Sequence, residues 1–225
     1  MEHIVVLTGA GISAESGIKT FRDADGLWEG HDIMEVASPE GWAKDPENVL
    51  NFYNIRRRQL LEVEPNAAHY ALAKLEEKYR VDIITQNIDD LHERAGSSRV
   101  IHLHGELLKA RSSVDENNIL DWKKDIIIGD RCRLNSQLRP QVVWFGEGVP
   151  MFGPAAKITA QAQVLIIIGT SMQVYPAASL MDFTSPGIPT YFIDPKPSIS
   201  HRENLKIIQQ KAVVGVPELV KDLLK

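Results

Sequence analysis

The stretch that decides the fold is Ile4-Val5-Val6-Leu7-Thr8-Gly9-Ala10-Gly11-Ile12-Ser13-Ala14, near the start of the chain. Residues 4–7 form a short apolar run, typical of a strand buried on both faces of a parallel sheet. The spacing Gly9-x-Gly11-x-x-Ala14 follows, which fits the looser dinucleotide-binding fingerprint. There the glycines permit a tight turn and a close approach of the backbone to a pyrophosphate at a helix N-terminus. Taken alone, the spacing fits a plain strand-to-helix turn equally well.

Three more runs of the same kind lie at residues 81–84, 164–168 and 190–193. The segments 49–61 and 66–79 carry apolar residues at helical spacing, and we expect a short helix at 217–224 with Pro217 at its first position. Alternating strand and helix signals predict an α/β fold with a Rossmann-like parallel sheet.

Two stretches interrupt this alternation. Residues 28–65 carry helix signals without a strand signal, and residues 109–139 are polar and irregular, with a turn at 115–118. We interpret 28–65 and 109–139 as a smaller inserted module. The Rossmann-like domain then comprises residues 1–27, 66–108 and 140–225.

Composition excludes several classes of protein. Of 225 residues, 25 are Lys or Arg and 30 are Asp or Glu, and this net charge of −5 disfavours a nucleic-acid partner. The single cysteine, Cys132, excludes an internal disulfide framework and a zinc site made of several thiolates. No apolar run is long enough for a membrane span, and the first residues do not resemble a signal peptide. We therefore expect a cytoplasmic protein without a membrane partner.

Polar side chains follow the predicted strands. Gln86, Asn87 and Asp89 come after the second strand, and Gly169-Thr170-Ser171 after the third. The carboxyl ends of parallel strands line the ligand crevice, where such groups hydrogen-bond an amide, a ribose or a phosphate. Helix capping by Asn87 or Asp89 is the competing interpretation.

Two histidines lie in Ile101-His102-Leu103-His104-Gly105-Glu106. A neutral imidazole suits a general base near pH 7, and the glycine after His104 indicates a close approach. A core or surface histidine is the usual alternative. Metal ligation is disfavoured because no cysteine or third histidine lies nearby.

In order along the chain, these motifs resemble those of the sirtuins, NAD-dependent protein-lysine deacylases, and the resemblance covers nearly the whole chain. The matching blocks are Gly9-Ala10-Gly11-Ile12-Ser13-Ala14-Glu15-Ser16-Gly17-Ile18 with Thr20-Phe21-Arg22, Gln86-Asn87-Ile88-Asp89, His104-Gly105, Val142-Val143-Trp144-Phe145-Gly146-Glu147 and Gly169-Thr170-Ser171.

The resemblance implies that NAD is bound as a co-substrate in an extended cleft. It places the pyrophosphate on Gly9, Ala10, Gly11 and Ser13, and a cofactor loop at Glu15, Phe21 and Arg22. It assigns the nicotinamide and ribose pocket to Gln86, Asn87 and Asp89, and the adenosine side to Gly169, Thr170 and Ser171. Asp194 stands where the family usually has Asn, so its assignment to NAD is less secure.

The implied reaction removes an acyl group from a protein lysine. The acyl oxygen attacks the ribose as nicotinamide leaves, His104 takes a ribose hydroxyl proton, and water releases O-acyl-ADP-ribose and free lysine. Two alternatives remain: a protein ADP-ribosyltransferase on the same fold, and a non-catalytic NAD or ADP-ribose-binding module.

The substrate is implied to be an acyl-lysine protein or peptide. Its main chain pairs beside Val143 and Gly146, and Phe145 helps to wall the acyl-lysine tunnel. Tyr53 and Arg56 are three apart on one helix face, and they match the carboxylate clamp of class III sirtuins, which remove succinyl, malonyl or glutaryl groups. Without the family, a solvated basic face at Arg56-Arg57-Arg58 is favoured.

The sequence departs from the family at the zinc site. Most sirtuins bind zinc with four cysteines, whereas residues 109–113 contain no cysteine and residues 130–135 contain only Cys132. We predict no zinc, a packing role for Cys132, and stabilisation of the module by burial of five apolar residues: Leu120, Trp122, Ile126, Ile127 and Ile128. The oligomeric state, the preferred acyl group and the target proteins do not follow from the sequence.

Overall fold

The computed structural model describes residues 1–19, 27–28, 30–198 and 203–225. Its strands are β1 (His3–Thr8), β2 (Leu27–Trp28), β3 (His31–Asp32), β4 (Arg80–Thr85), β5 (Val100–His102), β6 (Gly105–Ser112), β7 (Ile119–Asp121), β8 (Leu138–Val142), β9 (Val164–Ile168), β10 (Thr190–Ile193) and β11 (Leu205–Ile208). Its helices are α1 (Ile33–Val36), α2 (Pro39–Lys44), α3 (Pro46–Glu62), α4 (Ala67–Leu75), α5 (Leu91–Arg94), α6 (Phe152–Thr159) and α7 (Ala212–Leu223), with 3-10 segments η1 (Ala10–Ile12), η2 (Ala14–Ser16) and η4 (Ala177–Phe183).

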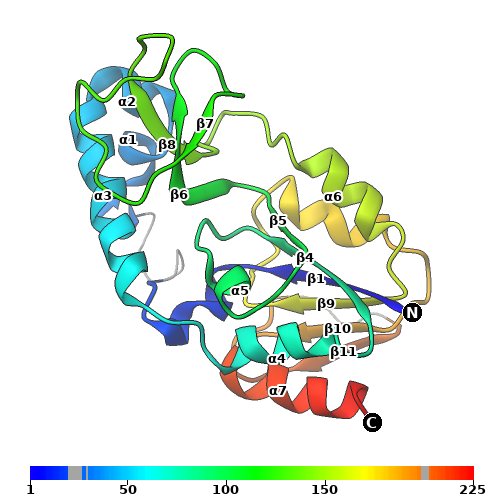
Figure 1. The fold of residues 1–225 in the computed structure, drawn as a ribbon. Coiled ribbons are helices and arrows are strands. Elements are labelled where there is room, and N and C mark those ends of the chain that lie inside the picture. The colour runs from blue at the N-terminus through cyan, green and yellow to red at the C-terminus, as the bar shows by residue number, and fades with distance from the viewer. Residues whose placement is uncertain (20–26, 29, 199–202) are drawn as a thin grey trace.

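The main sheet has six parallel strands in the order β11-β10-β9-β1-β4-β5 (Figure 1). The α/β prediction is confirmed, and the four predicted strands are β1, β4, β9 and β10. The strands β5 and β11 were not predicted. They lie at the two edges of the sheet and are mostly only partly buried, so they carry a weaker apolar signal than the central strands.

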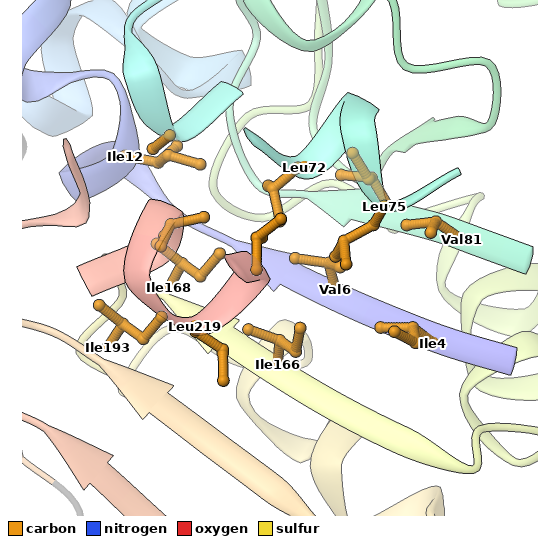
Figure 2. Packing of buried hydrophobic residues seen from close by; sticks show 14 of the residues in the cluster. Ile4, Val6, Ile12, Leu72, Leu75, Val81, Ile166, Ile168, Ile193 and Leu219 are labelled. Carbon is orange, nitrogen blue, oxygen red and sulfur yellow. The ribbon is translucent and has the colours of Figure 1, made fainter. Parts of the chain in front are cut away.

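Apolar side chains cover both faces of the main sheet. Ile4 and Val6 of β1 pack on one face, beneath α4 and α7, where Leu72 and Leu219 join them (Figure 2). Val5 and Leu7 point to the other face, against α6 and η4. This period-two alternation with two apolar sets explains why β1 is a continuous apolar run.

The sequence predicted that the polar segment 109–139 is irregular, and this prediction was wrong. The segment contains most of a three-stranded antiparallel sheet, β7-β6-β8, which lies beside α3 (Figure 1). An antiparallel sheet tolerates one solvated face, so its strands need no apolar run, and β7 is exposed along its length. The predicted turn is present, with the amide of Asn118 donating to the carbonyl of Asp115 at 3.1 Å.

The expected apolar support of this sheet is only partly correct. Ile126 is fully buried and Trp122 packs beside it, but Leu120, Ile127 and Ile128 are 38 %, 61 % and 52 % exposed. Polar contacts explain why only part of this apolar run is buried. The side chain of Asn54 on α3 donates to the carbonyl of Ile126 at 2.8 Å and accepts from its amide at 2.9 Å, which holds the loop with one apolar side chain inward.

Cys132 lies in the small core beside Ile126, Ala110 and Leu138. Its thiol contacts the hydroxyl groups of Ser112 and Ser136 at 3.4 and 3.2 Å. In the part of the chain that the structure describes, no group of three or more His, Cys, Asp or Glu side chains is arranged to hold a metal ion.

Local signals placed two helices correctly. Asp45 caps α3 with Pro46 at its first position, and Asn66 caps α4. The last helix is confirmed, but its predicted start was wrong, because α7 begins at Ala212 and Pro217 lies inside it. Residues 28–65 also contain strand residues, in the two-residue ladder β2-β3. No helix among the described residues is long and apolar enough to cross a membrane.

Candidate active site

The site lies where the strand order of the main sheet reverses. β1 lies between β9 and β4, so the chain continues from β1 towards β5 on one side and later from β9 towards β11 on the other. Ligands of open parallel sheets bind beyond the carboxyl ends of strands at such a switch point. The motifs after β1, β4, β9 and β10 meet there.

The glycine motif packs directly on the segment after β9. A Cβ atom on Gly9 would lie 2.8 Å from the carbonyl oxygen of Gly169, and one on Gly11 would lie 2.6 Å from its Cα. Gly169 has φ +61° and itself has no room for a side chain. The glycines are therefore required by this close backbone contact. Residues 10–16 form the short segments η1 and η2 in place of the expected α-helix, and up to residue 19, where the described stretch ends, no α-helix follows.

The loop after β4 holds a buried polar cluster. The Asn87 amide donates to Ser13 Oγ at 3.1 Å and to the carbonyl of Gly9 at 3.2 Å. Ser13 Oγ donates to Asp89 Oδ2 at 2.9 Å. Burial raises the pKa of the Asp89 carboxyl to about 6, although hydrogen bonds from Leu91 N and Ser13 oppose the rise. A carboxyl held against its desolvation cost is typical of a functional site.

His104 is oriented by the same loop. Its Nδ1 lies 3.0 Å from the carbonyl oxygen of Gln86, which only accepts, so Nδ1 carries the proton and Nε2 carries the lone pair. Burial lowers the pKa of His104 and keeps the ring neutral near pH 7, despite the Gln86 hydrogen bond. Gln86 is fixed in turn, because its amide donates to Thr170 Oγ1 at 3.0 Å.

His102 has a different environment. Its Nδ1 lies 3.0 Å from the carbonyl oxygen of Asn87, and its Nε2 lies 2.8 Å from Glu93 Oε1. Burial alone lowers its pKa, but the hydrogen bond and charge of Glu93 outweigh burial and raise it. His102 is therefore held in an ion pair on the side of the loop, and His104 is the histidine that lines the cleft.

Tyr53 and Arg56 lie together in the wall of the cleft, on α3. Arg56 Nη1 donates to the carbonyl of Phe52 at 2.7 Å, and its guanidinium lies 3.2 Å from the centre of the Phe52 ring. The solvated basic face is wrong for Arg56 and Arg57, which are buried, and fits only Arg58, which is exposed and pairs with Asp125. Arg57 is structural: it donates to the carbonyl of Leu107 at 3.1 Å and to Asn54 Oδ1 at 2.6 Å.

The segment after β8 also lines the cleft. The strand ends at Val142, the first residue of the motif at residues 142–147, so the rest of the motif continues beyond β8. The Val143 amide donates to the carbonyl of His104, and the Phe145 amide donates to the carbonyl of Ala37, both at 2.9 Å. The side chain of Phe145 is 43 % exposed.

These groups line one cleft of about 590 Å³, within the range of roughly 300–1,000 Å³ typical of small-molecule sites. It brings together every predicted site residue that the structure describes: Gly9, Ala10, Gly11, Ser13, Glu15, Tyr53, Arg56, Gln86, Asn87, Asp89, His104, Val143, Phe145, Gly146, Gly169, Thr170, Ser171 and Asp194. Phe21 and Arg22 lie outside the described residues.

Several lining residues were not predicted from the sequence. Trp144 and Glu147 lay inside a quoted motif, and Gln59 follows Arg56 by three on the same helix, so a helical-face argument would have included it. Lys211 carried no local signal. Its ammonium lies 3.5 Å from Glu15 across the mouth of the cleft.

Comparison with known proteins agrees with this geometry. Residues 9–176 match the model of the Sir2 family. An NAD-dependent protein deacylase of Helicobacter pylori (strain ATCC 700392 / 26695) is 60 % identical over 226 residues, covering 100 % of this chain and 99 % of the relative. One of Bacteroides thetaiotaomicron is 51 % identical over 226 residues, with 97 % of each chain covered.

Solved structures are similar over nearly the whole chain. A complex of a Sir2 homologue with NAD is 41 % identical with a TM-score of 0.90, covering 99 % of this chain and 89 % of that one. A Sir2 protein bound to an acetylated peptide is 31 % identical with a TM-score of 0.81, covering 98 % and 91 %. The fold, the order of the motifs and these likenesses show that the chain belongs to the Sir2 family.

Proposed function

We propose that this chain is an NAD-dependent protein-lysine deacylase that removes succinyl, malonyl and acetyl groups from protein lysines. The observation that carries the proposal is His104. Its Nδ1–H is tied to the Gln86 carbonyl, and it lines the same cleft as the glycine motif and the Tyr53–Arg56 pair. The identity with NAD-dependent protein deacylases supports the NAD requirement and the deacylase activity.

NAD fits the residues of the cleft. Gly9 and Gly11 leave bare backbone at the switch point, where a pyrophosphate is best held. The buried cluster of Asn87, Ser13 and Asp89 offers donors and a carboxylate for an amide and a ribose hydroxyl. When bound, NAD supplies a ribose carbon that accepts the acyl oxygen as nicotinamide departs.

The remaining NAD contacts are assigned by position around the cleft. Ala10 joins the glycine motif, Gln86 lies beside His104, and Glu15 lies at the mouth. Residues 169–171 and Asp194 follow β9 and β10, so they face the adenosine half. Asp194 is buried, and its Oδ1 accepts from the Lys196 amide at 2.8 Å.

The role of His104 follows from its tautomer. Nε2 holds the lone pair and takes the proton of a hydroxyl on the bound ribose, while the Gln86 carbonyl keeps the ring oriented. Because burial lowers the pKa of His104, the neutral ring is present at pH 7 and is lost as the pH falls through that pKa. A non-catalytic binding module does not require a histidine that is oriented and held neutral as a base, so His104 favours the enzyme.

The acyl end takes an acidic group. A guanidinium and a phenol on one helix face form a two-donor site for a carboxylate, and α3 presents Arg56 and Tyr53 to the cleft in this way. The peptide main chain lies along Val143, Phe145 and Gly146, so recognition depends little on peptide sequence.

The domain division follows the same logic. Residues 1–27, 66–108 and 140–225 form the NAD-binding domain, and residues 28–65 and 109–139 form the small module. Asn54 supports the grouping of the two inserted segments, because it links α3 of the first to Ile126 of the second. We expect the module to bind no zinc, so that a strong chelator should leave its fold unchanged.

One assay tests the function. The protein is incubated with acetyl-, succinyl- and malonyl-lysine peptides, with and without NAD, and the products are identified by mass. We expect NAD-dependent loss of acyl groups together with O-acyl-ADP-ribose. ADP-ribose attached to protein, without deacylation, would indicate a transferase on the same fold. The absence of any product would indicate a binding module.

A further inference from the structure

Trp144 lies directly behind the residues that we assign to the acyl end. Its indole Nε1–H donates to the hydroxyl oxygen of Tyr53 at 3.1 Å. The two residues are 91 positions apart in the chain, and both line the cleft. Tyr53 is fully buried and Trp144 is 2 % exposed, so this hydrogen bond is shielded from water.

The indole contacts two further side chains. The guanidinium of Arg139 lies 3.2 Å from the centre of the Trp144 ring, and Trp42 packs against Trp144 with ring centres 5.7 Å apart. Arg139 Nη1 donates to Glu147 Oε1 at 2.7 Å, and Glu147 Oε2 accepts from the Trp144 amide at 2.9 Å.

The support continues into the small sheet. Arg111 on β6 donates to Glu147 Oε1 at 3.1 Å, and Arg139 on β8 donates to the carbonyl of Val142 at 3.0 Å. Buried ions are stable only when they are paired and hydrogen-bonded, and this set meets that condition through Glu147. Trp144 is thus held by a paired network and not by apolar packing alone.

We propose that Trp144 is a positioning residue that sets the acyl selectivity of the cleft, by fixing the Tyr53 hydroxyl as a hydrogen-bond donor towards an acidic acyl group. A phenol oxygen that accepts from an indole N–H must direct its own proton away from the indole. Accepting this bond also strengthens the phenol as a donor. A carboxylate accepts such a bond, whereas the methyl group of an acetyl substrate does not.

The protonation state of Tyr53 agrees with this role. Burial raises the pKa of the phenol, and this outweighs the hydrogen bond from Trp144 and the nearby charges of Arg139 and Arg56. Tyr53 therefore keeps its proton throughout the physiological range and remains a donor.

The test is Trp144→Phe, which keeps an aromatic ring and removes the N–H. The inference rests on the proposed deacylase function, so kcat/KM is measured for succinyl- and acetyl-lysine peptides that share one sequence. We expect the succinyl-to-acetyl ratio of kcat/KM to fall about tenfold, the size of one hydrogen bond to a charged or polarised group. Binding of the succinyl peptide, measured by calorimetry, should weaken in parallel.

A double-mutant cycle separates positioning from packing. In a Tyr53→Phe background the hydroxyl is absent, so Trp144→Phe should produce no further change in the ratio. Trp122→Phe is the matched control. It removes a different indole N–H bond, which Trp122 of the small module donates to the carbonyl of Asp125 at 3.1 Å, and Trp122 does not line the cleft. We expect this control to leave the ratio unchanged.

Arg139→Lys provides a second route if Trp144→Phe does not fold. Lysine keeps the charge but cannot lie flat on the indole, so the ratio should fall severalfold. Equal losses for both peptides, or a full effect of Trp144→Phe in the Tyr53→Phe background, would overturn the inference. Failure of the wild-type protein to deacylate any peptide would instead refute the proposed function.

Discussion

The two ends of the cleft that we assign to NAD and to the acyl group, here the cofactor end and the acyl end, are built by opposite means. At the cofactor end, the backbones of Gly9, Gly11 and Gly169 touch, and no side chain fits between them. At the acyl end, buried side chains form the wall of the cleft. Stacking and hydrogen bonds hold Tyr53, Arg56 and Trp144 in place. The cofactor end therefore has no room for an added side chain at this contact, whereas we expect single substitutions to alter the acyl end. This difference suits a cleft with one constant co-substrate and a choice of acyl groups.

We expect the largest effect on stability and NAD binding from adding one methyl group at the cofactor end. In Gly11→Ala the new Cβ meets the Gly169 backbone at 2.6 Å, so the two segments must separate. We expect unfolding in urea to show a loss of about 3 kcal/mol, the upper end for overpacking, and calorimetry to show no NAD binding.

Gly153→Ala is the control for this prediction. A Cβ at Gly153 meets nothing within 4 Å, and the residue lies in α6. It should stabilise the protein by about 0.4–1 kcal/mol and preserve NAD binding. Normal NAD affinity in Gly11→Ala would show that the cofactor end is less rigid than the contact with Gly169 indicates.

The next effect is expected at the acyl end. Arg56→Met replaces the guanidinium by an apolar chain that still packs on Phe52. We expect the succinyl-to-acetyl ratio of kcat/KM to fall roughly 10- to 100-fold, since a hydrogen bond to a charged group contributes about 1.5–3 kcal/mol.

Arg58→Met serves as the matched variant here. Arg58 lies two residues further along α3 but is exposed and pairs with Asp125, away from the cleft. Its substitution should leave the ratio unchanged. If Arg56→Met slowed acetyl and succinyl substrates equally, the carboxylate clamp would be wrong.

The smallest effect is expected on the pH dependence of stability, when Asp89 is substituted. Its carboxyl has a pKa of about 6 in the fold against a reference of 3.8, so the folded protein holds this proton more tightly than the unfolded chain. The stabilisation is complete below pH 3.8 and is lost as the pH rises through about 6. Above pH 6 the buried carboxylate is therefore a cost.

Asp89→Asn removes that cost. We expect it to match the wild type near pH 4 and to be about 1 kcal/mol more stable at pH 8, measured by urea unfolding. The full shift corresponds to roughly 3 kcal/mol, but the amide loses the charge-assisted bonds from Ser13 and Leu91. Asp121→Asn, on the exposed strand β7, should show no such pH dependence. Destabilisation of Asp89→Asn at pH 8 would show that the carboxylate supports the fold.

The sequence predicted the parts of the molecule that depend on local pattern. Continuous apolar runs identified β1, β4, β9 and β10, and the motifs after those strands identified most of the cleft. Topology explains this success, since parallel strands bring their carboxyl ends together. The small sheet was missed because all three residues of β7 are exposed and carry no buried periodicity.

Long-range polar contacts could not be predicted from the sequence. No local pattern links Trp144 to Tyr53 or Asn54 to Ile126, because each pair is joined only by the folded chain. The failure at Ile127 and Ile128 has the same origin: the two bonds from Asn54 decide which side chain of the apolar run turns inward.

The most direct test of the account is His104→Ala, with NAD binding and turnover measured on one preparation. His104 acts on a proton and does not belong to the glycine cradle, so calorimetry should show NAD affinity close to that of the wild type. Deacylation should fall by roughly 10²- to 10⁴-fold, the range for loss of a general base. Retained deacylation, or loss of NAD binding together with turnover, would contradict the assignment of His104 as the base of this cleft.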